Sequence, residues 1–150
     1  MITTELIKEL RDKTGISVMQ CKKALEETAG DIEKAVVVLA QKSKDIAAKK
    51  GDRVLGSGVV SSYIHATGTV GTMVELLCET DFVAKNEEFR KLAYDIAMHV
   101  AAMDSEKESL LEEAFIKNPE MTITNLIASA IQKFGEKIEI GRFARYSTSN

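Results

Sequence analysis

Thr80-Asp81-Phe82-Val83-Ala84-Lys85-Asn86, hereafter the tip, is the stretch in which the periodicity of the sequence changes from that of a strand to that of a helix. Before it, residues 70–78 place one set of side chains at every second position, and after it residues 87–100 place apolar side chains at every third or fourth. These periods are typical of a half-buried β-strand and an amphipathic helix. The tip therefore predicts a strand, a turn and a helix in succession, as in an α+β fold.

The predicted turn carries an aromatic side chain beside an acid, Phe82 and Asp81. Burying a phenylalanine side chain stabilises a protein by roughly 1.5 to 3 kcal/mol. Phe82 is therefore expected either to fold back onto the core of this chain or to enter a pocket on a partner. In the second case Asp81 brings a negative charge to that pocket, which disturbs a site on the other protein without any chemistry on this chain.

The segments around the tip predict a small antiparallel sheet. Residues 58–78 alternate as a β-hairpin does, with a turn at Thr67-Gly68. Residues 137–146 are expected to be extended, with a β-bulge at Gly141 where the alternation changes phase. Asn86 is expected to cap the long helix after the tip, because its side chain can accept from free backbone N–H groups.

Two more helices are expected to pack on this sheet. Ser105-Glu106-Lys107-Glu108 matches a capping box and predicts a helix that ends before Asn118-Pro119, since the residue preceding proline avoids helical angles. Thr122 is expected to cap a last helix that Gly135 ends.

The first 41 residues predict a module of three helices. The first helix covers residues 5–13 and ends at Gly15, where glycine can take the left-handed conformation. Ser17 is expected to cap the second helix and Asp31 the third. The predicted domains are thus residues 1–41 (helical module), 42–56 (polar helical extension and linker), 57–147 (α+β core subdomain) and 148–150 (tail).

Composition narrows the class of protein. The 150 residues carry a formal net charge of -3, which lacks the positive field that binding to a phosphate backbone exploits, so direct nucleic-acid binding is not expected. No apolar run is long enough to span a bilayer, and no leader pattern stands at the N-terminus, so we expect a cytoplasmic protein away from membranes. Cys21 and Cys78 are interpreted as small buried residues of a reduced protein.

The sequence favours no catalytic, metal or nucleotide site. No local signature joins a cysteine to His65 or His99, which are interpreted as solvated or partly packed side chains. Neither histidine has a partner at metal-ligand spacing, and no glycine-rich phosphate loop is present, so no cofactor is expected. The acids Glu75, Glu79 and Asp81 are read as solubilising carboxylates, and the lysine-rich stretch 42–50 as a solvated helix face, with RNA contact as the alternative.

Two regions of the sequence, the N-terminal helices and the tip, carry a resemblance to a known family. Residues 10–15 (Leu-Arg-Asp-Lys-Thr-Gly), 19–25 (Met-Gln-Cys-Lys-Lys-Ala-Leu) and 30–35 (Gly-Asp-Ile-Glu-Lys-Ala) resemble the N-terminal helical module of translation elongation factor Ts. The tip resembles the core signature of the same family, and the likeness continues through Gly135-Glu136-Lys137-Ile138 and Arg142-Phe143. Two independent matches in the same order are more specific than either alone.

The resemblance implies a guanine nucleotide exchange factor for elongation factor Tu, with no covalent chemistry or cofactor of its own. In that family the N-terminal module docks on the nucleotide-binding domain of the GTPase, at positions that match Arg11, Val18 and Met19. The Asp-Phe pair inserts beside the bound magnesium, which assigns the wedge to Phe82 and displacement of the ion's coordination to Asp81. The motif residues Thr80, Val83 and Asn86 would support this pair.

Two expectations about partners follow from the resemblance. Longer members repeat the core subdomain, whereas this chain has one copy, and short members pair as homodimers, so a homodimer is expected here. The three-helix module also resembles ubiquitin-associated adaptor domains. The alternative function is therefore a binding adaptor that docks through Gly15 to Met19 and does not depend on Phe82.

Overall fold

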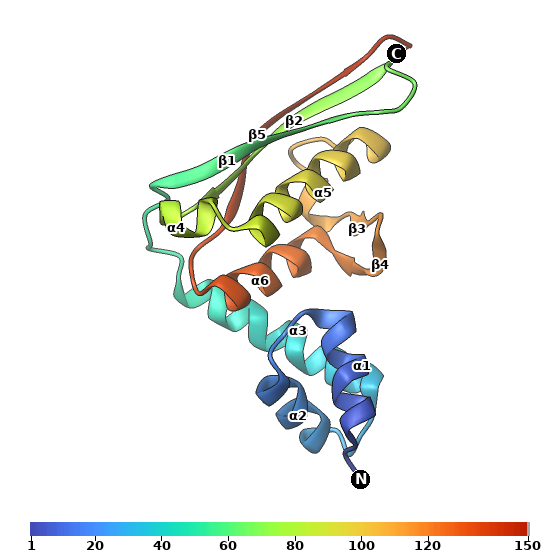
Figure 1. Ribbon diagram of the computed structural model, residues 1–150, viewed down its shortest axis with the longest axis vertical. Helices are drawn as coiled ribbons and strands as arrows, with labels where there is room; N and C mark the ends of the chain where they lie inside the picture. The colour runs from blue at the N-terminus through green and yellow to red at the C-terminus, as the bar shows by residue number, and fades with distance from the viewer. Residues whose placement is uncertain (150) are drawn as a thin grey trace. The chain divides into compact units, whose positions relative to one another are not determined.

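The computed structural model describes residues 1–149 and divides them into two compact units, residues 1–52 with 128–135 and residues 53–127 with 136–149 (Figure 1). The fold is α+β, as predicted. The elements in chain order are α1 (Thr4–Thr14), α2 (Val18–Glu27), α3 (Ile32–Lys49), β1 (Ser57–Ile64), β2 (Val70–Cys78), α4 (Asp81–Ala84), α5 (Glu87–Met103), η1 (Leu110–Glu112), β3 (Ala114–Phe115), β4 (Asn118–Thr122), α6 (Ile123–Phe134) and β5 (Glu139–Ser147).

The three N-terminal helices form as their caps predict. Gly15 ends α1 with a φ of 71°, a left-handed conformation that glycine adopts without steric cost. The side chain of Ser17 accepts from the backbone N–H of Gln20 at 3.3 Å, and that of Asp31 accepts from Lys34 at 3.1 Å. Between the helices lies one core, made of Leu10, Ile16, Cys21, Ala24, Leu25, Ala35 and Leu39.

The polar stretch after residue 41 continues α3 without a break as far as Lys49. Ser43 is buried on this helix, and its hydroxyl donates to the side-chain oxygen of Gln132. Gln132 lies in residues 128–135, the part of α6 that belongs to the first unit. The domain boundaries predicted from sequence within residues 42–56 stay a prediction.

The sheet of the second unit is antiparallel, with strand order β1-β2-β5. β1 and β2 form the predicted hairpin, in which Ser57 pairs with Cys78 and Ile64 with Gly71. β5 pairs with the other edge of β2, and its register shifts opposite Val74 to Leu76, which confirms the bulge expected at Gly141. The central strand β2 thus joins two strands that are far apart in the sequence.

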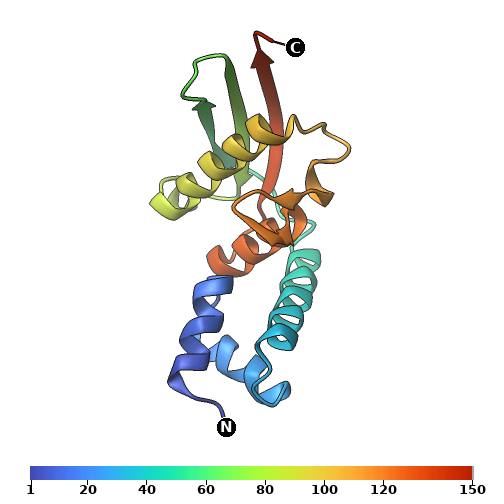
Figure 2. The same ribbon diagram turned by 90° about the vertical axis from the view of Figure 1, so that its right-hand side faces the viewer.

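Helix α5 covers one face of this sheet (Figure 2). Its side chains Phe89, Ala93, Ile96 and Val100 are fully buried, together with Val74 and Leu76 of β2. The hydroxyl of Thr72 donates to the backbone carbonyl of Ala97 at 2.7 Å, which ties β2 to α5. Asn86 caps α5 as predicted and accepts from the backbone N–H groups of Glu88 and Phe89 at 2.8 and 3.3 Å.

The opposite face of the sheet, hereafter the open face, carries apolar side chains in solvent. No helix of residues 53–127 or 136–149 covers it. Its exposed apolar residues come from all three strands: Val60, Ile64, Met73 and Tyr146.

The prediction of a helix that Ser105 begins and that ends before Asn118-Pro119 is wrong. Residues 105–113 form turns and the short η1, and β3 pairs with β4 in a hairpin that contains Pro119. The physical reason lies in Glu113, whose carboxylate accepts from the hydroxyls of the buried Ser105 at 2.6 Å and of Ser109 at 3.1 Å and so holds this segment in a set of turns. The last helix, in contrast, is as expected, because the Thr122 hydroxyl accepts from the N–H of Asn125 at 3.1 Å and Gly135 follows α6 with a left-handed φ.

His99 is neither solvated nor partly packed, contrary to the sequence-based interpretation, because it is completely buried on α5. Its Nδ1 accepts from the backbone N–H of Ile116 at 3.2 Å, and its Nε2 lies 2.8 Å from a carboxylate oxygen of Glu113. Burial alone raises the pKa of Glu113, but hydrogen bonds from Ser105, His99 and Ser109 outweigh it and hold that pKa below its ordinary value. His99 is therefore part of a structural network.

Candidate functional site: the tip

The tip folds as a capped turn of helix between β2 and α5. The side chain of Thr80 accepts from the backbone N–H of Val83 at 3.3 Å and so begins α4. Val83 and Ala84 are buried, and the carbonyl of Ala84 accepts from the Arg90 guanidinium of α5 at 3.2 Å. The structure therefore brings the predicted motif residues Thr80, Val83 and Asn86 together as the frame of the tip.

Phe82 points away from this frame and is 85% exposed. Sequence left open whether its ring folds back onto the core, and the structure shows that it does not. Its neighbour Val83 fills the core position instead. An aromatic ring held in solvent on a helical turn is available to a pocket of another protein.

Asp81 lies on the same turn as Phe82, as the first residue of α4. One of its carboxylate oxygens accepts from the Ser57 hydroxyl at 2.6 Å, and Ser57 begins β1. The carboxylate is exposed, so it can reach a partner together with Phe82. Ser57 was not singled out from sequence, because its distance of 24 positions from Asp81 is bridged only by the strand pairing.

The sequence-based interpretation of the neighbouring acids as solubilising carboxylates is incomplete, because Glu75 and Glu79 also make structural contacts. Glu75 on β2 forms a paired contact with Arg142, whose Nε and Nη2 donate at 3.0 and 2.9 Å. Hydrogen bonds from the Arg142 side chain and backbone lower the pKa of Glu75 to about 2. Glu79 accepts from Arg53 at 3.1 Å and from the backbone N–H of Lys137 at 2.5 Å.

The predicted docking residues all belong to the first unit and all are exposed. Arg11 is exposed on the last turns of α1, and Val18 and Met19 begin α2 after the loop of residues 15–17. Val18 is 49% exposed and Met19 is 80% exposed. Two apolar side chains at the start of α2 are therefore in solvent, and Arg11 adds an exposed positive charge on α1.

The chemical alternatives gain no support from the structure. Burial raises the pKa of both Cys21 and Cys78, which disfavours the reactive thiolate, and the burial expected of both residues is confirmed. Within residues 1–149 no three metal-ligating side chains gather at one place. None of the described helices is long and apolar enough to span a membrane.

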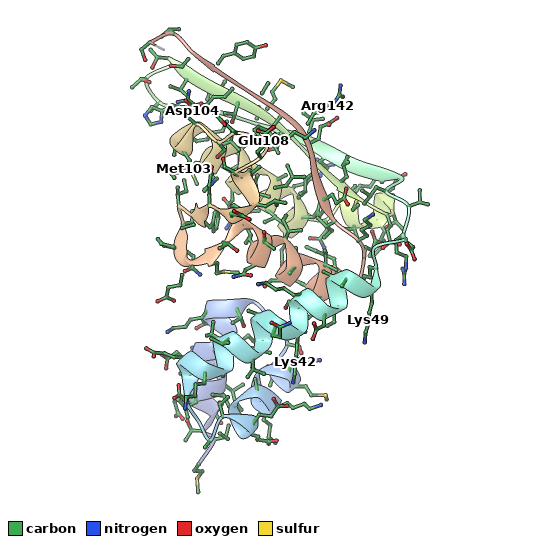
Figure 3. The ribbon with its side chains drawn as sticks, turned by 180° about the vertical axis from the view of Figure 1, so that it is seen from behind. Lys42, Lys49, Met103, Asp104, Glu108 and Arg142 are labelled. Atoms are coloured by element: carbon green, nitrogen blue, oxygen red, sulfur yellow. The ribbon has the colours of Figure 1, made fainter. Side chains whose placement is uncertain are left out.

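The lysine-rich stretch 42–50 lies mostly along α3 (Figure 3). Lys42 is paired with Glu27 at 3.2 Å, and Asp45 adds a carboxylate to the same helix. These acids reduce the positive field that an RNA backbone would need.

Comparison with known proteins first defines the class of the two units. Residues 1–45 match the family model of a UBA-like domain, and residues 79–150 match that of elongation factor TS. A UBA-like helical module thus precedes a match to the elongation factor TS model that contains the whole tip.

Relatives then define the family. Proteins named elongation factor Ts from Carboxydothermus hydrogenoformans, Syntrophomonas wolfei and Desulfotalea psychrophila are 40%, 43% and 40% identical to the chain. The matches cover 97% of this chain and 88%, 90% and 97% of those proteins. The chain belongs to the elongation factor Ts family. The alignments span 191 to 192 positions against 150 residues here, so these relatives carry segments that this chain lacks.

Proposed function

We propose that this chain is a guanine nucleotide exchange factor that promotes GDP release from elongation factor Tu. One observation carries the proposal, namely that Phe82 is 85% exposed at the end of a framed turn beside the Asp81 carboxylate. A soluble protein gains nothing for its own fold from this placement, because the apolar ring stays in water. Membership of the elongation factor Ts family supports the choice of partner.

The mechanism divides the work between the two units. The exposed residues Arg11, Val18 and Met19 dock on the nucleotide-binding domain of the GTPase. Phe82 wedges between partner elements near the magnesium and phosphate site, and Asp81 competes for the coordination of the ion. The exchange factor performs no covalent chemistry and holds no cofactor of its own.

Thermodynamic linkage completes the cycle. If the exchange protein weakens the affinity of the GTPase for nucleotide by some ratio, nucleotide weakens the affinity for the exchange protein by the same ratio. Rebinding of nucleotide therefore releases the exchange protein. Each tenfold loss of GDP affinity requires about 1.4 kcal/mol of coupling. Burial of one phenylalanine side chain, worth roughly 1.5 to 3 kcal/mol, can supply one to two such steps.

The open face supports a homodimer as the second partner proposal. Val60, Met73 and Tyr146 leave apolar area in solvent on one side of the sheet. The Glu75–Arg142 pair lies among them with both charges already matched, so a second copy could cover the face without burying an unpaired charge. We propose that the open face of a second copy of the chain covers this surface. The proposed compartment of the protein is the cytoplasm.

The binding adaptor remains the alternative, and the UBA-like module with its exposed Val18 and Met19 favours it. A titration separates the two functions. The chain is added to elongation factor Tu loaded with a fluorescent GDP analogue, and the release rate is recorded against its concentration. An exchange factor raises the rate to a plateau, whereas an adaptor binds the partner and leaves the rate unchanged.

A further inference from the structure

Two carboxylates cross at the base of the tip, and we name Glu79 and Glu136 the carboxylate clamp. One oxygen of Glu136 accepts from the backbone N–H groups of Glu79 and Thr80 at 3.1 and 3.0 Å. Its other oxygen accepts from the Thr80 hydroxyl at 2.6 Å. A single side chain therefore holds three donors at the point where β2 ends and α4 begins.

Glu79 in turn accepts a hydrogen bond from the segment that carries Glu136. One of its oxygens accepts from the backbone N–H of Lys137, the residue after Glu136, at 2.5 Å. The other accepts from the Arg53 guanidinium at 3.1 Å, and the Glu79 side chain is only 15% exposed. Each carboxylate thus binds the backbone beside the other, and both bonds to the backbone are charge-assisted.

The clamp continues directly into the helix that presents Phe82. The Thr80 hydroxyl that donates to Glu136 also accepts from the N–H of Val83, which closes the cap of α4. Glu136 therefore fixes the orientation of the turn from behind, while Phe82 and Asp81 face outward. A loop already held in its binding conformation loses less conformational freedom when it binds.

We propose that Glu136 is a positioning residue for nucleotide exchange, which holds the turn so that Phe82 and Asp81 enter the partner in a fixed orientation. This role rests on the proposed exchange function. It requires no contact between Glu136 and the partner. Glu136 should therefore govern the rate of the bound complex and leave the strength of docking unchanged.

The test compares Glu136→Ala, Glu136→Gln and the control Glu139→Ala in the full chain. Glu139 lies on β5, is 54% exposed, and pairs only with the Lys137 ammonium at 3.4 Å among the contacts of the described residues. The maximal rate of GDP release from elongation factor Tu is expected to fall about tenfold for Glu136→Ala, with the half-saturating concentration within about twofold. Glu136→Gln keeps one carbonyl oxygen for the two N–H donors and should restore part of the rate.

Amide hydrogen exchange of the free variants supplies a readout that needs no partner. Loss of the acceptor should speed exchange at Glu79 and Thr80 in Glu136→Ala, while the protection of α5 amides stays as in wild type. A general loss of folding would instead raise the half-saturating concentration and leave the maximal rate unchanged.

Three results would overturn the positioning role: unchanged exchange at the two amides, an unchanged maximal release rate, or an equal loss of rate in Glu139→Ala. If the wild-type chain does not accelerate GDP release, the exchange function fails and the positioning role fails with it. The amide data in that case still show whether the clamp exists, so the two failures are distinguishable.

Discussion

A phenylalanine that is 85% exposed stands seven positions before one that is completely buried, Phe82 before Phe89. The difference lies in the neighbours, because Val83 and Ala84 take the inward positions of α4 and Phe82 takes the outward one. A valine side chain is enough to anchor the turn, so the larger apolar side chain stays in solvent. The outward position of Phe82 on α4 therefore supports its proposed role as a wedge.

Glu75 yields a pH-dependent prediction at the same scale. Its pKa in the folded chain lies near 2 against an ordinary value of 4.5, chiefly because Arg142 donates to it. A depressed pKa stabilises the fold at pH values above 4.5, and this contribution is lost as the pH falls toward 2. Glu75→Gln should therefore lower the Tm slightly at pH 7, and the difference from wild type should vanish near pH 2.

Thermal unfolding at the two pH values measures this difference, with the exposed Glu108→Gln as the control. The expected effect at pH 7 is small, because the Arg142 side chain is 90% exposed and solvent screens the pair. An equal difference at both pH values would contradict the assignment.

The residues that could and could not be predicted differ in how local their signals are. Ser17, Asp31 and Asn86 were predicted as caps because each bonds to a backbone N–H within three positions. Glu136 was missed as a structural contact because its bonds to Glu79 and Thr80 cross 57 and 56 positions. Its place in the family-like segment 135–138 was the only available signal.

Among the elements, residues 104–113 show why a capping box is a weak signal by itself. The pattern fits a helix, but Ser105 is buried and its hydroxyl donates to the Glu113 carboxylate at 2.6 Å. The same carboxylate also accepts from Ser109 at 3.1 Å and meets His99 at 2.8 Å. Figure 3 labels Met103, the last residue of α5, together with Asp104 and Glu108 of the segment that follows it. Tertiary contacts therefore override the local preference.

Glu113→Ala is predicted to destabilise the second unit. The variant leaves Nε2 of the completely buried His99 without its partner, and an unsatisfied buried group costs about 1 to 3 kcal/mol. Glu112→Ala, which changes the exposed neighbour, is the matched control. Urea unfolding should show a lower midpoint for the first variant only, and equal midpoints would contradict the role of the network.

Gly58 sets how closely the strands of the hairpin approach each other. A Cβ atom there would lie 2.6 Å from the backbone carbonyl oxygen of Leu76, which cannot move away without breaking the strand pairing. Gly58→Ala should therefore destabilise the chain by about 1 to 3 kcal/mol. At Gly56 the added Cβ meets nothing closer than 3.4 Å, so Gly56→Ala should cost less in the same unfolding measurement. Equal losses of stability in the two variants would show that the close approach to Leu76 does not determine the effect of Gly58→Ala.

For the whole molecule, the α+β class and the order of its parts were predictable because both periodicities are long and regular. The open face could not be predicted, because the apolar alternation in β1 does not reveal that Val60 and Ile64 point away from α5. That choice is made by the register, which places Val60 opposite Glu75. A strand shifted by one position would reverse it.

The homodimer gives the prediction at this scale. Light scattering at micromolar concentration should give twice the chain mass of 16.5 kDa. Met73→Lys, at the centre of the open face, should shift the mass to that of a monomer, because an unpaired charge would be buried between the two sheets. Leu111→Lys places the same charge at another exposed apolar position. A monomeric wild type, or a variant that remains dimeric, would contradict the proposed interface.

The most direct test of the tip as the exchange element is the release of a fluorescent GDP analogue from elongation factor Tu at saturating concentration of the chain. Wild type, Asp81→Ala/Phe82→Ala and the control Leu111→Ala are compared, since Leu111 is also an exposed apolar residue of the second unit. Truncation of a buried aromatic anchor typically costs at least about 2 kcal/mol, which is more than tenfold in rate. We predict acceleration by wild type and Leu111→Ala but not by the double variant, and full acceleration by a folded double variant would contradict the proposal.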